Sequence, residues 1–133
     1  MAATSPSRPH VLVLEDAPTY RQIVASRLAD AGFRVSAAAE AGRALSLAEH
    51  ERLDLAIVDY YLPDYPGTEF IKRLRATPRY QHLPIIVLTA RDEELNLEYL
   101  RMRLSVVVLS KSCTLRRVLD AVSECLTIAA GAC

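Results

Sequence analysis

Asp59 stands at the end of an apolar run and directly before a turn. Residues 55–58 are all apolar, and Pro63 and Gly67 follow the aspartate within eight positions. An uninterrupted apolar run fits a strand covered on both faces, as in a parallel sheet. Asp59 is then the first residue free of the sheet, where its carboxylate can bind a ligand or simply cap the next helix.

Other apolar runs also end on side chains that can do chemistry. In chain order these side chains are Glu15, Asp16, Thr89 and Lys111. Taken singly, each has an ordinary explanation, because acids cap helices and threonine is common at strand ends. Lys111 is unusual for this chain, which uses arginine for nearly all its basic residues: it contains fourteen arginines and only one other lysine, Lys72. A compact ammonium is not interchangeable with a guanidinium at a crowded site.

Together these side chains predict a site for phosphoryl transfer. Three carboxylates in one crevice repel one another unless a cation neutralises them. Mg2+ is the economical cation, since it takes one or two carboxylates and a phosphate oxygen and keeps several waters. A lysine and a hydroxyl beside the metal would meet the remaining charge of a phosphoryl group.

The elements that must position this site alternate along the chain. Strands are expected at 10–14, 33–37, 55–58, 84–88 and 104–109, the last because of its three consecutive valines. Helices are expected at 18–31, 39–50, 67–76, 92–103 and from Thr114 onward. Pro18, Gly32 and Pro78 mark helix ends, and Thr114 suits a cap.

Strands that alternate with helices predict an α/β fold with a single doubly wound, five-stranded parallel sheet. The flavodoxin-like order 2-1-3-4-5 is the most common for this number of elements. Strands one and three are then neighbours, and ligands bind beyond the carboxyl ends of the strands at that point. Residues 10–127 would form the domain, with tails at 1–9 and 128–133.

Composition narrows the class of protein further. The chain has 133 residues, 51% of them hydrophobic, so one domain can bury a real core. Sixteen basic and sixteen acidic residues balance, which does not favour nucleic acid or a charged membrane surface as partners. Three unpatterned cysteines and a polar N-terminus predict a cytoplasmic protein with no anchor and no membrane span.

From 10 to 127 the chain resembles the receiver domain of two-component response regulators. The resemblance rests on Glu15-Asp16, on Asp59 with Leu62-Pro63 and Gly67, on Thr89-Ala90, and on Lys111. It implies that Asp59 accepts a phosphoryl group from a histidine of a sensor kinase or phosphotransfer domain. It also implies that Mg2+ binds Asp16, Asp59 and the backbone carbonyl of Tyr61, with help from Glu15, and that Thr89 and Lys111 contact the phosphoryl oxygens.

Three features of the sequence depart from the pattern of the family. Ser112 replaces the proline that usually follows the lysine across a cis peptide bond. Without that bond the Lys111 side chain would point in a different direction. Val108 replaces the aromatic residue whose rotamer reports phosphorylation, and Arg103-Leu104-Ser105 replaces the usual Gly-Ala before the last strand. A degenerate receiver, acting as a phosphorylation-independent interaction module, is therefore the alternative.

Two further hypotheses concern residues around the site. Tyr61 and Arg91 would flank the acyl phosphate and hinder the attacking water. Tyr99, Met102 and Leu104 would either belong to the core or form part of a homodimer face with the last strand and helix. A nucleotide-binding enzyme of the same fold is disfavoured because no Gly-rich loop follows the first strand. We therefore expect a signalling domain that catalyses its own phosphorylation, not a turnover enzyme.

Overall fold

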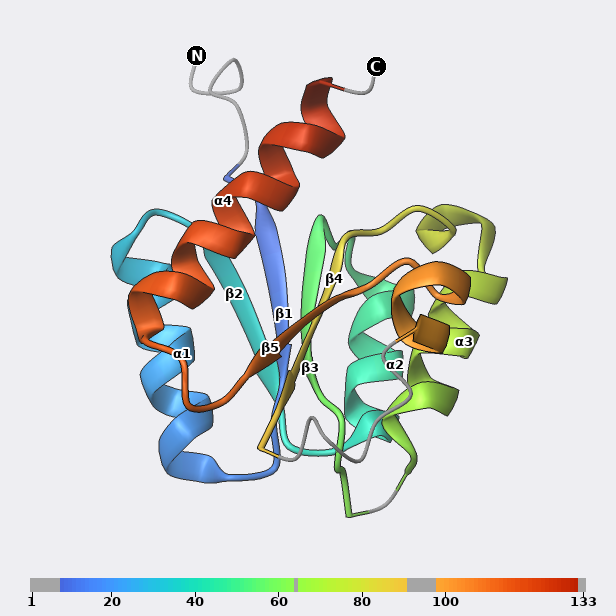
Figure 1. Ribbon diagram of the computed structural model, residues 1–133, viewed down its shortest axis with the longest axis horizontal. Helices are drawn as coiled ribbons and strands as arrows, with labels where there is room; N and C mark the ends of the chain where they lie inside the picture. Colours follow the sequence, from blue (N-terminus) through green and yellow to red (C-terminus); the bar gives the residue numbers. More distant parts are fainter. Residues whose placement is uncertain (1–7, 64, 91–97, 132–133) are drawn as a thin grey trace.

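The computed structural model describes residues 8–63, 65–90 and 98–131, with the side chains of 130 and 131 left out. Its centre is a parallel five-stranded sheet in the order β2-β1-β3-β4-β5, as predicted (Figure 1). The strands are β1 (His10–Leu14), β2 (Arg34–Ala38), β3 (Leu55–Asp59), β4 (Ile85–Thr89) and β5 (Val107–Ser110). Three of them, β1, β3 and β4, are buried along their whole length.

Helices cover both faces of this sheet (Figure 1). α1 (Pro18–Asp30) and α4 (Leu115–Gly131) pack on one face. α2 (Ala41–His50), α3 (Gly67–Ala76) and the short η4 (Tyr99–Arg103) pack on the other, and a further turn, η2 (Pro78–Tyr80), follows α3. The central strands are therefore shielded from water on both sides, which explains their uninterrupted apolar sequences.

Side chains alternate between two apolar clusters along each buried strand. In β1, Val11 and Val13 face α1 and α4, whereas Leu12 and Leu14 face α2 and α3. The other central strands, β3 and β4, alternate in the same way. This period of two fixes the register of each strand, because a slip of one residue would exchange its two faces.

Local sequence signals set the end of α1 and the start of α4 close to the predicted positions. Gly32 adopts a φ of 100° directly after α1, and its N–H bonds to Ala29 O at 3.0 Å. The next N–H, of Phe33, bonds to Leu28 O at 3.1 Å, which completes a Schellman motif. At the start of α4 the Thr114 hydroxyl accepts a bond of 3.1 Å from the N–H of Arg117.

The segment before β5 differs from the prediction. The strand begins at Val107 and not at Leu104, because the N–H groups of Leu104 and Val106 bond back to the carbonyls of Tyr99 and Leu100. The bond from Leu104 spans five residues, so η4 is a π-helical turn and not the end of an α-helix. The expected start of this helix, at 92–97, lies outside the described residues.

Arg75 of α3 explains why Leu104 and Ser105 stay out of the sheet. Its guanidinium donates to four backbone carbonyls, those of Tyr80, Leu83, Leu104 and Ser105, at 2.6 to 3.2 Å. Ser105 takes a φ of 55°, a left-handed conformation that glycine adopts more readily. A long-range side chain therefore overrides the strand propensity of this segment.

α4 continues to Gly131, so residues 128–131, expected in a tail, are helical. Its apolar side faces the sheet, with Val118 and Val122 buried and Cys125 and Leu126 partly buried beside them. Of the helices that the structure describes, none is long and apolar enough to cross a membrane.

Candidate functional site

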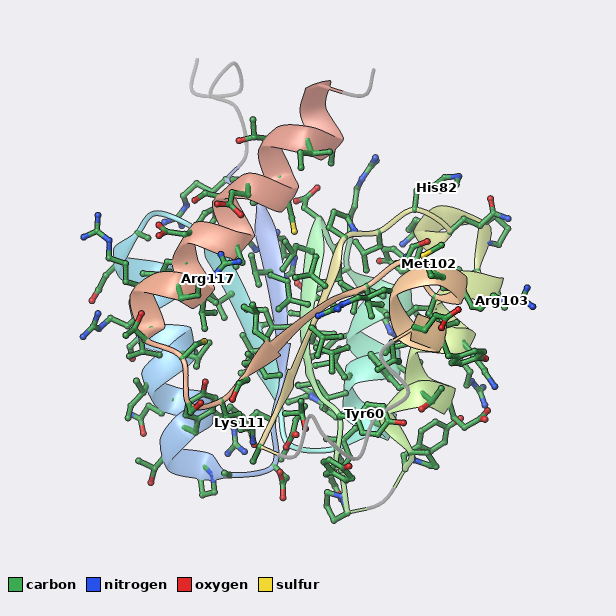
Figure 2. The ribbon with its side chains drawn as sticks, viewed as in Figure 1. Tyr60, His82, Met102, Arg103, Lys111 and Arg117 are labelled. Carbon is green, nitrogen blue, oxygen red and sulfur yellow. The ribbon has the colours of Figure 1, made fainter. Side chains whose placement is uncertain are left out.

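The carboxyl ends of β1, β3, β4 and β5 bring the predicted residues to one edge of the sheet. Leu14 of β1 pairs with Val58 of β3, so Glu15 follows its strand beside Asp59. The sheet hydrogen bonds continue into this edge, because Tyr60 N–H bonds to Leu88 O at 3.1 Å and Lys111 N–H to Thr89 O at 2.8 Å. Figure 2 shows Tyr60 and Lys111 at this end of the sheet and His82 at the opposite end.

Three carboxylates meet at this edge. Oxygen atoms of Glu15, Asp16 and Asp59 all lie within 4.8 Å of one another. Glu15 and Asp59 are only 2% and 4% exposed, whereas Asp16 faces solvent. Backbone N–H groups orient the two buried acids, with Ala17 bonding to Glu15 Oε2 at 3.1 Å and Tyr61 to Asp59 Oδ1 at 3.2 Å.

Lys111 enters the same cleft. Its Nζ lies 2.8 Å from Glu15 Oε1 and 3.2 Å from Asp59 Oδ2. The Lys111–Ser112 peptide is trans, and the turn is instead closed by the Ser110 hydroxyl, which accepts from Ser112 N–H at 3.1 Å. The replacement of the usual proline therefore does not turn the lysine away from the acids.

Burial and mutual repulsion change the acidity of these groups. Burial, together with the charge of Glu15, raises the pKa of Asp59 to about 7. Burial also opposes ionisation of Asp16, but hydrogen bonds with Asp59 and Glu15 outweigh it and lower the pKa of Asp16. Burial disfavours the charged form of Lys111 as well, yet Glu15 and Asp59 raise its pKa overall. The cleft therefore holds more negative charge than one lysine neutralises.

The donor set fits a hard divalent cation. Glu15 Oε1 is buried and makes no hydrogen bond of good angle among the described residues, although Lys111 Nζ lies close to it. Such an oxygen gains from a ligand with an extra positive charge or an ordered water. Carboxylate oxygens on one open side of a cleft suit Mg2+, which keeps several of its waters.

The turn after Asp59 requires its glycine. A Cβ on Gly67 would lie 2.6 Å from the carbonyl oxygen of Tyr60, a distance that no real side chain tolerates without movement. The N–H of Gly67 bonds to this same oxygen at 3.2 Å, and Tyr61 pairs with Pro66 across the loop. The loop is thus folded tightly back onto the residue that follows the aspartate.

The remaining predicted residues occupy different parts of the structure. Thr89 is fully buried at the end of β4, and Val108 is half-buried in β5. The Tyr61 ring is 38% exposed and meets the ring of Tyr60 edge-on, with 5.1 Å between their centres. Arg91 lies outside the described residues. Near β5, Leu104 belongs to the core, Tyr99 is half-buried and Met102 is 75% exposed. The core prediction therefore holds for Leu104, whereas the side chain of Met102 is available to a homodimer face.

Two residues of α1 that the sequence analysis did not single out also reach this edge. Arg21 Nη1 donates to the carbonyls of Glu15 at 2.9 Å and Asp16 at 3.3 Å. The ring of Tyr20 lies under the Lys111 ammonium, 5.3 Å from Nζ to the ring centre. The only signal for them in the sequence is their place in the helical turn that follows the acidic pair.

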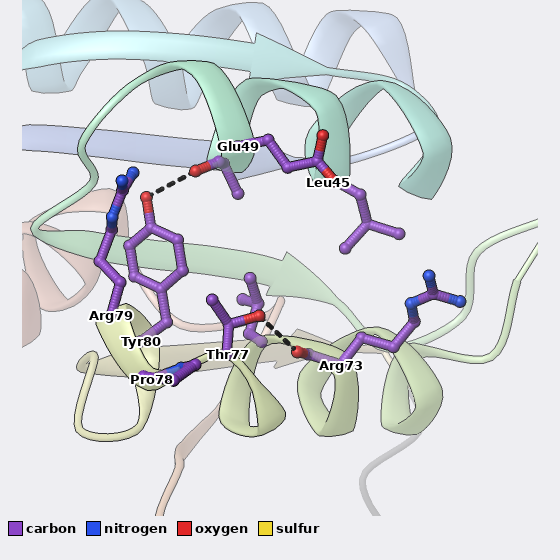
Figure 3. A pocket seen from close by; sticks show the side chains of 9 residues that line it. Leu45, Glu49, Arg73, Thr77, Pro78, Arg79 and Tyr80 are labelled. Atoms are coloured by element: carbon purple, nitrogen blue, oxygen red, sulfur yellow. Dashed lines mark hydrogen bonds between the residues drawn. The ribbon is translucent and has the colours of Figure 1, made fainter.

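A hollow of about 380 Å³ lies elsewhere, between α2 and the α3–η2 segment (Figure 3). Its floor contains Leu45, Ala48 and Leu74, and its one carboxylate is that of Glu49. The Tyr80 hydroxyl beside it is occupied in bonds to the carbonyls of Ala48 and Glu51, at 2.8 and 2.9 Å. This hollow has no cluster of acids, so we place the functional site at the sheet edge.

A five-stranded parallel sheet of this order, with an acidic cleft and a lysine at its carboxyl edge, defines a doubly wound α/β fold with its candidate site at the topological switch point. The family model described as "Response regulator receiver domain" matches residues 11–123. The chain therefore belongs to the response regulator receiver family, as the resemblance predicts.

Individual proteins agree with this assignment. The chain is 29% identical over 85 residues to the two-component response regulator ORR5 of rice, covering 63% of each protein. It is 32% identical to the chemotaxis protein CheY of Pseudomonas aeruginosa, covering 60% of this chain and 65% of that protein. These matches thus span less than two thirds of the relatives' own length.

Solved structures agree over more of the chain. The chemotaxis response regulator CheY4 of Vibrio cholerae aligns with a TM-score of 0.80 and 28% identity, covering 90% of this chain and 99% of CheY4. A sensor protein from Polaromonas sp. JS666 aligns with a TM-score of 0.82 and 27% identity, covering 90% and 97%. The shared fold therefore occurs both in a protein described as a chemotaxis response regulator and in one described as a sensor.

Proposed function

We propose that this chain is a phosphoacceptor receiver that takes a phosphoryl group onto Asp59 from a phosphohistidine. The donor would be a sensor histidine kinase or a histidine phosphotransfer domain, and the signal would be relayed by a change in conformation. The observation that carries the proposal is the Lys111 ammonium, 3.2 Å from Asp59 Oδ2 and 2.8 Å from Glu15 Oε1, in a cleft with three carboxylates.

The chemistry follows from the position of Asp59. A carboxylate oxygen of Asp59 attacks phosphorus, a new O–P bond forms, and the P–N bond to the donor imidazole breaks. The imidazole leaves with the electron pair of that bond and takes a proton from solvent. The Lys111 ammonium stabilises the negative charge on the phosphoryl oxygens, and the hydroxyl of Thr89 would contact the same oxygens. The sheet amides of Tyr60 and Lys111 hold the edge in place.

Mg2+ would be held by Asp16, Asp59 and the backbone carbonyl of Tyr61, with Glu15 assisting directly or through water. It would supply positive charge that lets three acids ionise together and that neutralises the incoming phosphoryl group. The buried Oε1 of Glu15, which meets the Lys111 ammonium but has no further partner among the described residues, supports this assignment. Titration of the purified protein with Mg2+, followed by tyrosine fluorescence or NMR, would measure the binding directly.

The first test is chemical phosphorylation. Incubation with acetyl phosphate and Mg2+ should add one phosphoryl group, seen as a mass increase of the intact protein. Asp59→Asn should abolish the addition and Lys111→Met should slow it, whereas Asp120→Asn, an exposed change on α4, should leave it unchanged. Equal labelling of wild type and Asp59→Asn would refute Asp59 as the acceptor.

The donor requires its own experiment. Purified histidine kinases or phosphotransfer domains, loaded with labelled phosphate, would be mixed in turn with the wild type and with Asp59→Asn. Rapid transfer from at least one of them to the wild type alone is the expected result. Labelling by acetyl phosphate without transfer from any phosphohistidine protein would refute that donor class while leaving Asp59 as the acceptor.

Tyr61 and Arg91 would lengthen the lifetime of the acyl phosphate by hindering the attacking water. The exposed ring of Tyr61, two residues after Asp59, supports this role. Tyr61→Ala should lose its phosphoryl group faster than the wild type in a dephosphorylation time course. A rate no faster than that of the wild type would remove the idea.

The second candidate is a degenerate receiver that binds a partner without being phosphorylated. Val108 favours it, because a valine cannot change between buried and exposed rotamers as an aromatic residue can. This candidate predicts that beryllofluoride with Mg2+ leaves the NMR spectrum unchanged. The leading proposal predicts shifts that extend beyond the cleft.

A homodimer through η4, β5 and α4 belongs to the leading proposal, in which the chain is a phosphoacceptor receiver. Met102, Val107 and Ile128 are 75%, 38% and 71% exposed, and an apolar hollow of about 420 Å³ lies between β5 and α4. Light scattering with and without beryllofluoride would show whether the mass doubles on activation.

We further propose that the protein acts in the cytoplasm, where a kinase would supply the phosphoryl group. Fractionation of cells would test this location.

A further inference from the structure

The Lys111 ammonium meets a third group besides the two carboxylates. The ring of Tyr20, from the first turn of α1, has its centre 5.3 Å from Nζ. A cation within about 6 Å of a ring face is attracted by the negative potential there. The ring thus adds an attraction that involves no exchangeable proton and no negative charge.

Packing holds this ring in place. Tyr20 is half-buried and lies against the apolar cluster between the sheet, α1 and α4. Its hydroxyl is buried and has no hydrogen-bond partner among the described residues. Burial, and then the nearby charges of Cys113, Glu15 and Asp59, raise the pKa of this phenol, while Lys111 opposes the rise. The orientation of the ring is therefore set by the core and not by a bond of its own hydroxyl.

Lys111 needs such a restraint. Its side chain is a flexible four-carbon stem, and its backbone is followed by a trans peptide to Ser112 in a serine-closed turn. Glu15 and Asp59 compete for the ammonium at 2.8 and 3.2 Å. When the charge on Asp59 changes, the two carboxylates alone would move the ammonium, whereas the attraction of the ring stays the same.

We propose that Tyr20 is a positioning residue that holds the Lys111 ammonium in the cleft through its ring face. Lys111 is then in place when a phosphoryl group reaches Asp59. The kinetic part of this inference rests on the proposed function, but the contact between ring and ammonium does not. Tyr20→Phe keeps the ring and should behave as the wild type, while Tyr20→Leu loses the ring face but keeps an apolar side chain.

NMR tests the contact without any phosphorylation. The chain has only two lysines, so isotope-labelled lysine gives two ε-methylene signals. That of Lys111 should be shifted upfield by the ring in the wild type and Tyr20→Phe, and should lose this shift in Tyr20→Leu. Lys72, which lies over the ring of Tyr99, is the internal control and should not move. An unchanged Lys111 signal in Tyr20→Leu would overturn the inference.

Kinetics test the consequence. Phosphorylation by acetyl phosphate with Mg2+ should be about fivefold to thirtyfold slower in Tyr20→Leu, which is the rate equivalent of a partly desolvated cation–π contact. In the Lys111→Met background the same change should cause no further slowing, because there is no ammonium left to position. Equal slowing in both backgrounds would show a merely structural role and overturn the inference. A wild type that takes no phosphoryl group refutes the proposed function instead, and the NMR result then decides whether the contact exists.

Discussion

Replacement of Asp59 by asparagine should stabilise the metal-free protein at alkaline pH. Burial and Glu15 raise the pKa of this carboxyl from 3.8 to about 7, so the folded state disfavours its ionised form. That difference corresponds to at most about 4 kcal/mol. Water reaches the cleft beside exposed Asp16 and screens part of the repulsion, so we take about half, ~2 kcal/mol.

The pH dependence gives the prediction its sign. The raised pKa contributes to stability fully below about pH 4, and this contribution is lost as the pH rises through about 7. In metal-free buffer, Asp59→Asn should therefore exceed the wild type by ~2 kcal/mol near pH 8 and by little near pH 4. For a chain of this size the alkaline difference corresponds to roughly 5–10 °C in Tm.

Urea denaturation at several pH values, with EDTA or with Mg2+, measures this difference. Asp120→Asn, an exposed change on α4, should stay within about 0.5 kcal/mol of the wild type throughout. Saturating Mg2+ should stabilise the wild type more than Asp59→Asn, since the variant lacks one carboxylate ligand. An Asp59→Asn protein that is less stable than the wild type in alkaline EDTA would refute the electrostatic reasoning, as would a difference independent of pH.

Three further substitutions test other parts of the structure. Ser105→Gly should raise the free energy of unfolding by about 0.5–1 kcal/mol, because glycine adopts the left-handed φ of 55° without strain. Urea denaturation measures this change, and a loss of stability would contradict the assignment of strain. Gly67→Ala should cost at least ~2 kcal/mol and weaken Mg2+ binding, because its Cβ would collide with the carbonyl of Tyr60; an unchanged affinity in a metal titration would count against the tight loop. Tyr80→Phe should cost about 1–3 kcal/mol in thermal or urea unfolding, since two buried backbone groups and one partly buried one lose this partner. A neutral effect would show that water replaces the hydroxyl.

The sheet and its acidic edge could be predicted because they depend on local patterns. The apolar runs before Glu15, Asp59 and Thr89 identify buried parallel strands, and parallel strands bring their carboxyl ends together. Gly32 and Thr114 stop and start helices through bonds to their immediate neighbours. Such features need no knowledge of the rest of the molecule.

The features that could not be predicted depend on contacts between distant residues. The valines after Ser105 predict a longer strand. Instead Arg75, about thirty residues earlier, donates hydrogen bonds to the carbonyls of Leu104 and Ser105 and keeps both residues out of the sheet. Ser112 cast doubt on the aim of Lys111, and only the three-dimensional arrangement shows its ammonium between Glu15 and Asp59. No spacing rule links a tyrosine in the first helix to a lysine ninety residues later.

The amides that tie the cleft to the sheet also determine how freely its backbone can move. The N–H groups of Glu15, Tyr60 and Lys111 bond to carbonyls of neighbouring strand ends at 2.8 to 3.1 Å. The conformational entropy of these residues is thus lost on folding, so a metal ion or phosphoryl group need not order them again. Their amide hydrogens should exchange with solvent only when the sheet edge opens, which makes them natural probes of local opening at the site.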